Sequence, residues 1–113
     1  MEKELIVKVL FFIIDNLRSR GVWGGRHTAI YNLTKGMPSW ITQTNKGRRA
    51  INYAIKVGLN NKFLLIKKST QELHFFLNSA KSKEIIYFLK KAEDFVKTND
   101  NKIFREICLV LRI

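Results

Sequence analysis

A stretch near the middle of the chain, NKGRRAINYAIKVG (residues 45–58), decides the fold. At 100° per residue, as on an α-helix, this stretch separates into two halves. One half holds Asn45, Lys46, Arg48, Arg49, Asn52, Tyr53 and Lys56, and the other holds Gly47, Ala50, Ile51, Ala54, Ile55, Val57 and Gly58. Neither half contains an acidic residue. The pattern predicts a helix that buries one side and presents cations and amides on the other.

Capping and turn residues give this helix its ends. Thr42 or Thr44 is expected to cap its start, because threonine hydroxyls accept hydrogen bonds from the first free backbone N–H groups. The helix is expected to run to about Val57, where Gly58 and Asn60-Asn61 end it.

Two more helices are predicted on the N-terminal side. Glu4 to Arg18 is apolar almost all round, which is typical of a helix buried on more than one side, and we expect a second copy of the chain to cover one of them. Gly21-Val-Trp-Gly-Gly then allows a short extended piece. Thr28 is expected to cap a short helix over residues 29–35, which Gly36 and Pro38 end.

On the C-terminal side the sequence predicts a hairpin and two helices. Residues 63–68 and 73–77 are strand-like, with Ser69-Thr-Gln-Glu as the turn between them, and helices are expected over residues 82–96 and 102–111. The fold class is therefore mostly α with a small β-hairpin (α+β), in a single domain of residues 1–113. A winged helix–turn–helix is expected over residues 4–78, followed by C-terminal helices over residues 79–113 that could serve dimerisation.

The charge of the chain is concentrated in half of its length. The 113 residues carry 21 Lys and Arg against 9 Asp and Glu, a net charge of +12. Residues 16–71 contain eleven of these cations and no acid at all, so all nine acids lie outside this stretch. Such segregation indicates a polyanionic partner. Nucleic acid is the first candidate and an anionic membrane the second. The longest apolar run, residues 9–14, is far too short to span a bilayer, so no membrane partner is expected.

The central helix carries the side chains that read base edges, since Arg pairs with guanine and Asn with adenine. The expected base contacts are Asn45, Arg48, Arg49 and Asn52. The expected phosphate contacts are Arg18, Arg20, Arg26, Lys35, Lys46, Lys56, Lys67 and Lys68. For some of these cations a structural role is the alternative to a phosphate contact. Lys67 and Lys68 could instead protect an exposed strand edge, and Arg18 and Arg20 could instead cap a helix end.

The remaining candidate residues favour structural roles. Trp23 and Trp40 are expected in the core, with stacking on bases as the alternative. His27 is expected to be a structural hydrogen-bonding group with no second His near it in the sequence, and Cys108 a buried small hydrophobe. One Cys and two His do not supply a zinc site, and no nucleotide-binding or hydrolase motif occurs. We therefore expect no enzyme, no cofactor and no metal, in a cytoplasmic protein.

Several short strings occur in a defined order: Gly24-Gly25-Arg26-His27-Thr28, then Lys35-Gly36-Met37-Pro38, then the basic helix and a Lys-rich hairpin ending Leu77-Asn78. Together they resemble a group of small archaeal winged-helix proteins that are largely uncharacterised. The resemblance spans residues 21–78 and implies a fold rather than an activity. The hairpin turn departs from the group, which carries a Tyr-Gly pair there.

These observations predict a sequence-specific double-stranded DNA-binding protein that regulates transcription as a homodimer. The alternative is a winged-helix module associated with RNA or the ribosome, using the same basic face. A protein-interaction domain whose charge serves only solubility is a third reading.

Overall fold

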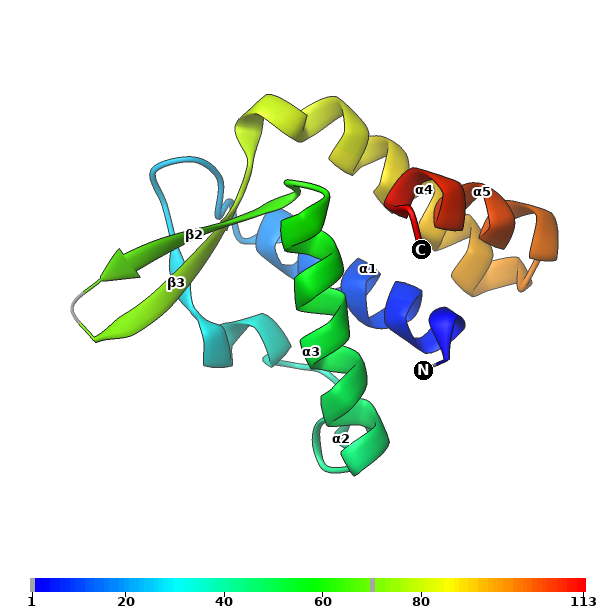
Figure 1. Cartoon of the computed structure of the whole chain (residues 1–113), viewed down its shortest axis with the longest axis horizontal. Coiled ribbons are helices and arrows are strands. Elements are labelled where there is room, and N and C mark those ends of the chain that lie inside the picture. Colours follow the sequence, from blue (N-terminus) through cyan, green and yellow to red (C-terminus); the bar gives the residue numbers. More distant parts are fainter. Residues whose placement is uncertain (1, 70) are drawn as a thin grey trace.

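Helix α1 (Lys3–Ser19) lies at the centre of the molecule and is covered on two sides. In this computed structural model, which describes residues 2–69 and 71–113, α3 (Asn45–Asn60) crosses one side of α1 and α4 (Ser82–Thr98) packs on another (Figure 1). The buried side chains of α1 are Leu5, Ile6, Val7, Val9, Leu10, Ile13, Ile14 and Leu17. Helix α4 thus occupies the side that the sequence assigned to a second copy of the chain.

The remaining elements confirm a mostly helical α+β fold with a small antiparallel sheet. They are β1 (Thr28–Ala29), the 3-10 helix η1 (Ile30–Thr34), α2 (Ser39–Thr42), β2 (Leu64–Ser69), β3 (Glu72–Leu77), the 3-10 turn η2 (Ser79–Lys81) and α5 (Asn101–Leu111). The predicted hairpin is present, and its register pairs Leu64 with Leu77 and Lys67 with His74. The predicted turn includes Thr70, which lies outside the described residues.

A third strand, which the sequence did not predict in this place, joins the hairpin. Strand β1 pairs with β3 and gives the order β1-β3-β2. The short helix predicted over residues 29–35 is present as the 3-10 helix η1, but the prediction that Thr28 caps it is wrong. Thr28 pairs with Phe75 in the sheet, and its hydroxyl accepts a hydrogen bond from the Asn32 side chain at 3.0 Å. Only the five residues of η1 coil after it, since strand pairing holds Ala29 extended.

Short-range signals set the start of α3 correctly, and at its end the predicted stop at Asn60-Asn61 is right while the one at Gly58 is wrong. The Thr44 hydroxyl accepts a hydrogen bond from the Gly47 N–H at 3.0 Å, as predicted for a capping threonine. Helix α3 continues through Gly58 to Asn60, because Gly58 is packed against Leu10 and Leu64 rather than placed in a turn. The sequence also missed α2: Pro38 was read as a helix end, but its carbonyl accepts the first bonds of this short helix.

The two C-terminal helices form where the sequence predicts them. Asn99 takes a left-handed conformation that ends α4, and the Asp100 carboxylate accepts a hydrogen bond from the Lys102 N–H at 2.8 Å to cap α5. A 2.7 Å ion pair between Lys91 and Glu106 ties the helices together. The side chains of Ile107 and Leu111 are buried within the chain, so the apolar face of α5 is largely covered by its own fold.

Among the residues that the structure describes, no helix has the length and apolar character needed to cross a bilayer.

Candidate nucleic-acid interface

The two predicted halves of α3 are confirmed residue by residue. All seven side chains of the polar half are exposed, and all seven residues of the other half are buried. Asn45, Arg49, Asn52 and Lys56 lie at three- and four-residue spacing and run along the middle of the exposed half. Lys46 and Arg48 flank this stripe on opposite sides. The result is an exposed helix face with cations and amides and without a carboxylate.

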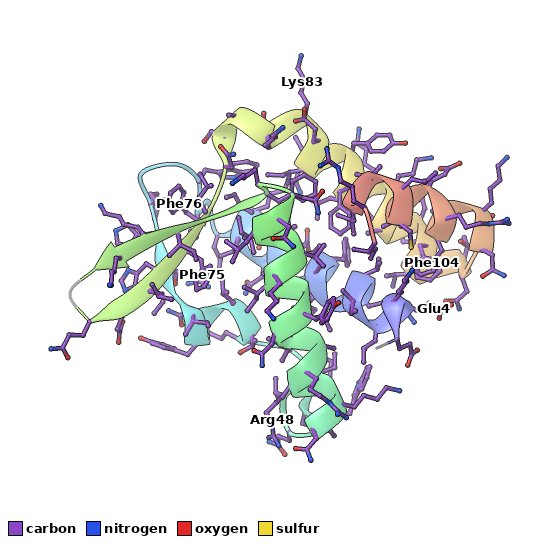
Figure 2. The ribbon with its side chains drawn as sticks, in the orientation of Figure 1. Glu4, Arg48, Phe75, Phe76, Lys83 and Phe104 are labelled. Atoms are coloured by element: carbon purple, nitrogen blue, oxygen red, sulfur yellow. The ribbon has the colours of Figure 1, made fainter. Side chains whose placement is uncertain are left out.

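The N-terminal end of α3 is held firmly by α2. The Thr44 hydroxyl donates a hydrogen bond to the Trp40 carbonyl at 2.8 Å while it caps α3. A Cβ added at Gly47 would overlap the backbone carbonyl of Ile41, so only glycine allows the two helices to approach this closely. The turn between them therefore presents the start of α3 in one defined orientation, at the end of the helix that projects from the body (Figure 2).

The four predicted base-contacting residues fall into two kinds. Arg48 donates a hydrogen bond to the Asn45 side-chain oxygen at 2.7 Å, so these two side chains satisfy each other. Within the described part of the chain, the side chains of Arg49 and Asn52 make no hydrogen bond and no ion pair. Their donors and acceptors are therefore available to a ligand without any exchange of partners.

Lys46, a predicted phosphate contact, has an intramolecular partner. Its ammonium group lies 2.8 Å from the Glu2 carboxylate at the start of α1. This hydrogen bond and the positive charge of Lys46 lower the pKa of Glu2. The pair is exposed, so it contributes little to stability, and a phosphate would have to displace Glu2 to reach Lys46.

The predicted phosphate contacts outside α3 are spread over several elements. Arg18 lies in the last turn of α1 and Arg20 directly follows the helix, and Arg20 donates to the carbonyl of Asn32 in η1 at 3.3 Å. Lys35 is exposed at the end of η1, and Arg26 is exposed in the loop before β1. The structure gives no contact that joins these four residues to the exposed stripe of α3.

The two hairpin lysines lie on opposite faces of the sheet. Residues paired across antiparallel strands share a face, and faces alternate along a strand. Lys68 pairs with Leu73 and shares its face with buried Leu64 and Phe75, the face packed toward the helices. Lys67 pairs with His74 on the other face. Only Lys68 therefore lies on the side of the hairpin that α3 contacts.

The sequence missed a contact between its two histidines. The Nδ1 atoms of His27 and His74 are 2.6 Å apart, and Nε2 of His74 lies 3.2 Å from the Glu72 carboxylate. His27 is thus a hydrogen-bonding group, as predicted, but a second His does lie beside it. Partial burial is the largest cause that lowers the pKa of His27. Electrostatic interactions with Lys67 and with His74 lower it further. The two residues are 47 positions apart, and only the pairing of β1 with β3 brings them together.

The prediction that the two tryptophans pack in the core is right for only one of them. Trp23 packs partly buried against the core, whereas Trp40 is 59% exposed, which makes the prediction for Trp40 wrong. It belongs to α2, whose Ile41 fills the core position instead. Cys108 is half-buried, and burial raises the pKa of its thiol. The described residues contain no group of three or more His, Cys, Asp and Glu that could hold a metal ion.

Comparisons with protein-family models, with curated proteins and with solved structures found no match to this chain. The chemistry and placement of the side chains are therefore the basis for a functional assignment.

Proposed function

We propose that the protein is a sequence-specific double-stranded DNA-binding protein with α3 as its recognition helix. The observation that carries this proposal is the exposed face of α3, which bears Arg49, Asn52 and Lys56 and no acid. A solvated helix face usually mixes Glu with Lys, because pairs of opposite charge support the helix. A face of Arg, Asn and Lys alone instead matches the acceptors of guanine, the edge of adenine and the phosphates beside them.

The order of the elements supports a winged helix–turn–helix as the finer description of the fold. Helices α2 and α3 with the turn between them form the helix–turn–helix, β2 and β3 form the wing, and β1 completes the sheet. In this architecture the second helix of the turn unit enters the major groove. The N-terminal end of α3, next to α2, projects from the rest of the molecule, as insertion into a groove requires (Figure 1).

The side chains divide into two functional groups in this proposal. Asn45, Arg48, Arg49 and Asn52 contact base edges, with Arg49 and Asn52 ready to bind and Asn45 and Arg48 exchanging their mutual hydrogen bond for bonds to DNA. Phosphate contacts come from Lys46 and Lys56 on α3 and from the cations that flank it, which sets position and affinity rather than sequence. The proposal includes a role in transcription regulation as a homodimer, since dimers of this architecture bind paired half-sites.

The first test compares the binding of duplex DNA with the binding of RNA. The wild-type protein is titrated against a random duplex DNA pool and against structured RNA at several salt concentrations. If about six phosphates are neutralised, log K against log salt falls with a slope of about −5 for DNA. Tighter binding to RNA at every salt concentration favours the RNA-associated alternative, and a flat salt response contradicts both.

A matched pair of charge reversals locates the surface. Arg49→Glu changes the exposed face of α3, whereas Lys83→Glu makes the same change in charge on α4, where the side chain points away from α3 (Figure 2). The proposal predicts that Arg49→Glu abolishes most of the DNA affinity and that Lys83→Glu retains most of it. Equal losses would mean that net charge, and not the face of α3, governs binding.

A further inference from the structure

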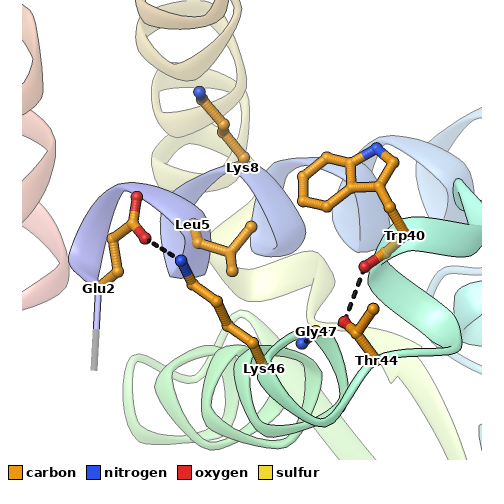
Figure 3. A pocket seen from close by; sticks show the side chains of 7 residues that line it. All are labelled: Glu2, Leu5, Lys8, Trp40, Thr44, Lys46 and Gly47. Atoms are coloured by element: carbon orange, nitrogen blue, oxygen red, sulfur yellow. Dashed lines mark hydrogen bonds and ion pairs between the residues drawn. The ribbon is translucent and has the colours of Figure 1, made fainter.

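A cavity of about 400 Å³ lies where α1, α2 and α3 meet. Its walls are Glu2, Leu5, Lys8, Trp40, Thr44, Lys46 and Gly47, seen from close by in Figure 3. This volume is within the range of pockets that hold small molecules. The stripe of α3 that faces DNA in the proposed function does not line it, apart from the flanking residue Lys46.

The walls combine one exposed aromatic ring with aliphatic surface. The Trp40 indole projects from α2 beside the cavity, and Leu5 forms its floor (Figure 3). The indole has no hydrogen-bond partner among the described residues and no ring stacked on it. A planar aromatic group in the cavity would cover both apolar surfaces, and stacking on an indole is favourable beyond the area buried.

The rim of the cavity carries more positive than negative charge. Lys46 is neutralised by Glu2 at 2.8 Å. Lys8 has no carboxylate within ion-pair distance in the described part of the chain, and its ammonium lies 5.9 Å from the centre of the Phe95 ring. Lys8 thus lines the cavity while its ammonium lies toward Phe95 at the rim, and the flexible side chain has to turn to meet an anion bound beside Trp40. With that turn, the cavity complements a ligand with an aromatic ring and one negative charge.

We infer that this cavity is a binding site for a small aromatic anion, such as an aromatic carboxylate, with its ring on Trp40 and its charge at Lys8. A consequence that rests on the proposed function is regulation of DNA binding. Thr44 and Lys46 belong to the start of α3, so an occupied cavity places a second anion beside a predicted phosphate contact. Binding of the anion therefore weakens binding of DNA, and DNA weakens binding of the anion by the same factor.

The site is tested without DNA, so its failure is distinct from a failure of the proposed function. The probe is 2-naphthoate, with neutral 2-naphthamide as its matched control, and binding is followed by the NMR signals of the Trp40 indole N–H and the Gly47 amide. The inference predicts saturable shifts of both signals by 2-naphthoate. We expect a roughly two- to five-fold weaker affinity for the amide, the factor an exposed ion pair supplies.

Three variants assign the effect to named side chains. Trp40→Ala removes saturable binding, and Lys8→Gln lowers the affinity for 2-naphthoate to that for the amide. Tyr31→Ala, which removes another exposed aromatic ring outside the cavity, leaves binding unchanged. Absence of saturable shifts at millimolar probe, equal affinity for the acid and the amide, or binding that persists in Trp40→Ala would each overturn the inference.

Discussion

Gly47 and Gly58 lie in the same helix, and their neighbours predict different responses to the same substitution. A Cβ at Gly47 meets the backbone of Ile41, which can move only if α2 separates from α3, whereas a Cβ at Gly58 would lie 2.7 Å from Cδ1 of the Leu64 side chain. Alanine gains about 1 kcal/mol of helix propensity at either position. We expect Gly47→Ala to lose about 2–3 kcal/mol of stability and Gly58→Ala to stay within about 1 kcal/mol of wild type.

Urea denaturation of the two variants measures this difference directly, with each variant as the control for the other. A Gly47→Ala protein as stable as Gly58→Ala would show that the contact between α2 and α3 is loose. The rigid presentation of α3 would then fail with it.

The contact of His27 with His74 predicts that stability depends on pH near neutrality. The pKa of His27 in the folded protein is below its ordinary value of 6.5, so the unfolded chain binds a proton more readily than the folded one. Neutral His27 is therefore compatible with full stability above pH 6.5. The free energy of unfolding decreases as the pH falls from 6.5 toward the pKa of His27 in the folded protein. Glu2, whose pKa is lowered from 4.5, titrates below this window.

Thermal unfolding of wild type and His27→Gln between pH 7.5 and pH 5.5 checks the sign. The wild type should lose more of its Tm on acidification than the variant, which has no titrating group at this position. The charged neighbours of the pair, Lys67 and Glu72, are unchanged in both proteins. A variant with the same slope, or a wild type that is more stable at pH 5.5, would contradict this assignment.

At the scale of elements, the alternation of strand faces separates the two hairpin lysines. Lys68 lies on the side of the hairpin that contacts α3, and Lys67 lies with His74 on the other. We therefore expect Lys68→Ala to reduce the salt slope of DNA binding by about one unit, the effect of one lost phosphate contact. Lys67→Ala is the matched control and should leave the slope unchanged. The reverse result would place the DNA on the opposite face of the hairpin.

Local signals in the sequence were sufficient for most elements and failed where distant residues decide. The periodicity of residues 45–58 predicted both faces of α3, and the cap of Thr44 predicted its start. Thr28 was assigned to a helix because its local sequence resembles a cap, but pairing with Phe75 determines its structure. Gly58 was read as a helix end because the sequence does not reveal that Leu64 packs on it.

The candidate site shows the same division. Which α3 side chains are exposed followed from helical spacing alone. The bond between Asn45 and Arg48, the ion pair of Lys46 with Glu2, and the separation of Lys67 from Lys68 all depend on three-dimensional placement. Trp40 was misplaced because hydrophobicity predicts burial on average, and in α2 the neighbouring Ile41 takes the buried position.

At the scale of the whole molecule, the predicted homodimer needs a different surface from the one first expected. The apolar sides of α1 and α5 are largely covered within the chain. Large apolar side chains that remain exposed on the C-terminal helices are Ile86, Tyr87 and Val96 on α4 and Leu109 on α5, the last 80% exposed. Exposed apolar surface on a small protein favours association, and we expect two copies to meet at Leu109.

Sedimentation equilibrium tests the homodimer. The wild type should have twice the 13.2 kDa chain mass at micromolar concentration, and Leu109→Lys should have the mass of one chain. A wild type that stays at the mass of one chain on concentrating would refute the dimer. A dimeric Leu109→Lys would refute only the surface assigned to it.

The central claim is that the exposed face of α3 reads the sequence of duplex DNA, and Arg49 tests it most directly because it has no partner within the described chain. Selection from a random duplex library gives the preferred site. Wild type and Arg49→Ala are then titrated against that site and against random duplex at three salt concentrations. If Arg49 contacts bases, Arg49→Ala loses about 1–3 kcal/mol of binding free energy on the preferred site and much less on random DNA. Equal losses on both duplexes would contradict it, because Arg49 would then contribute charge and not base recognition.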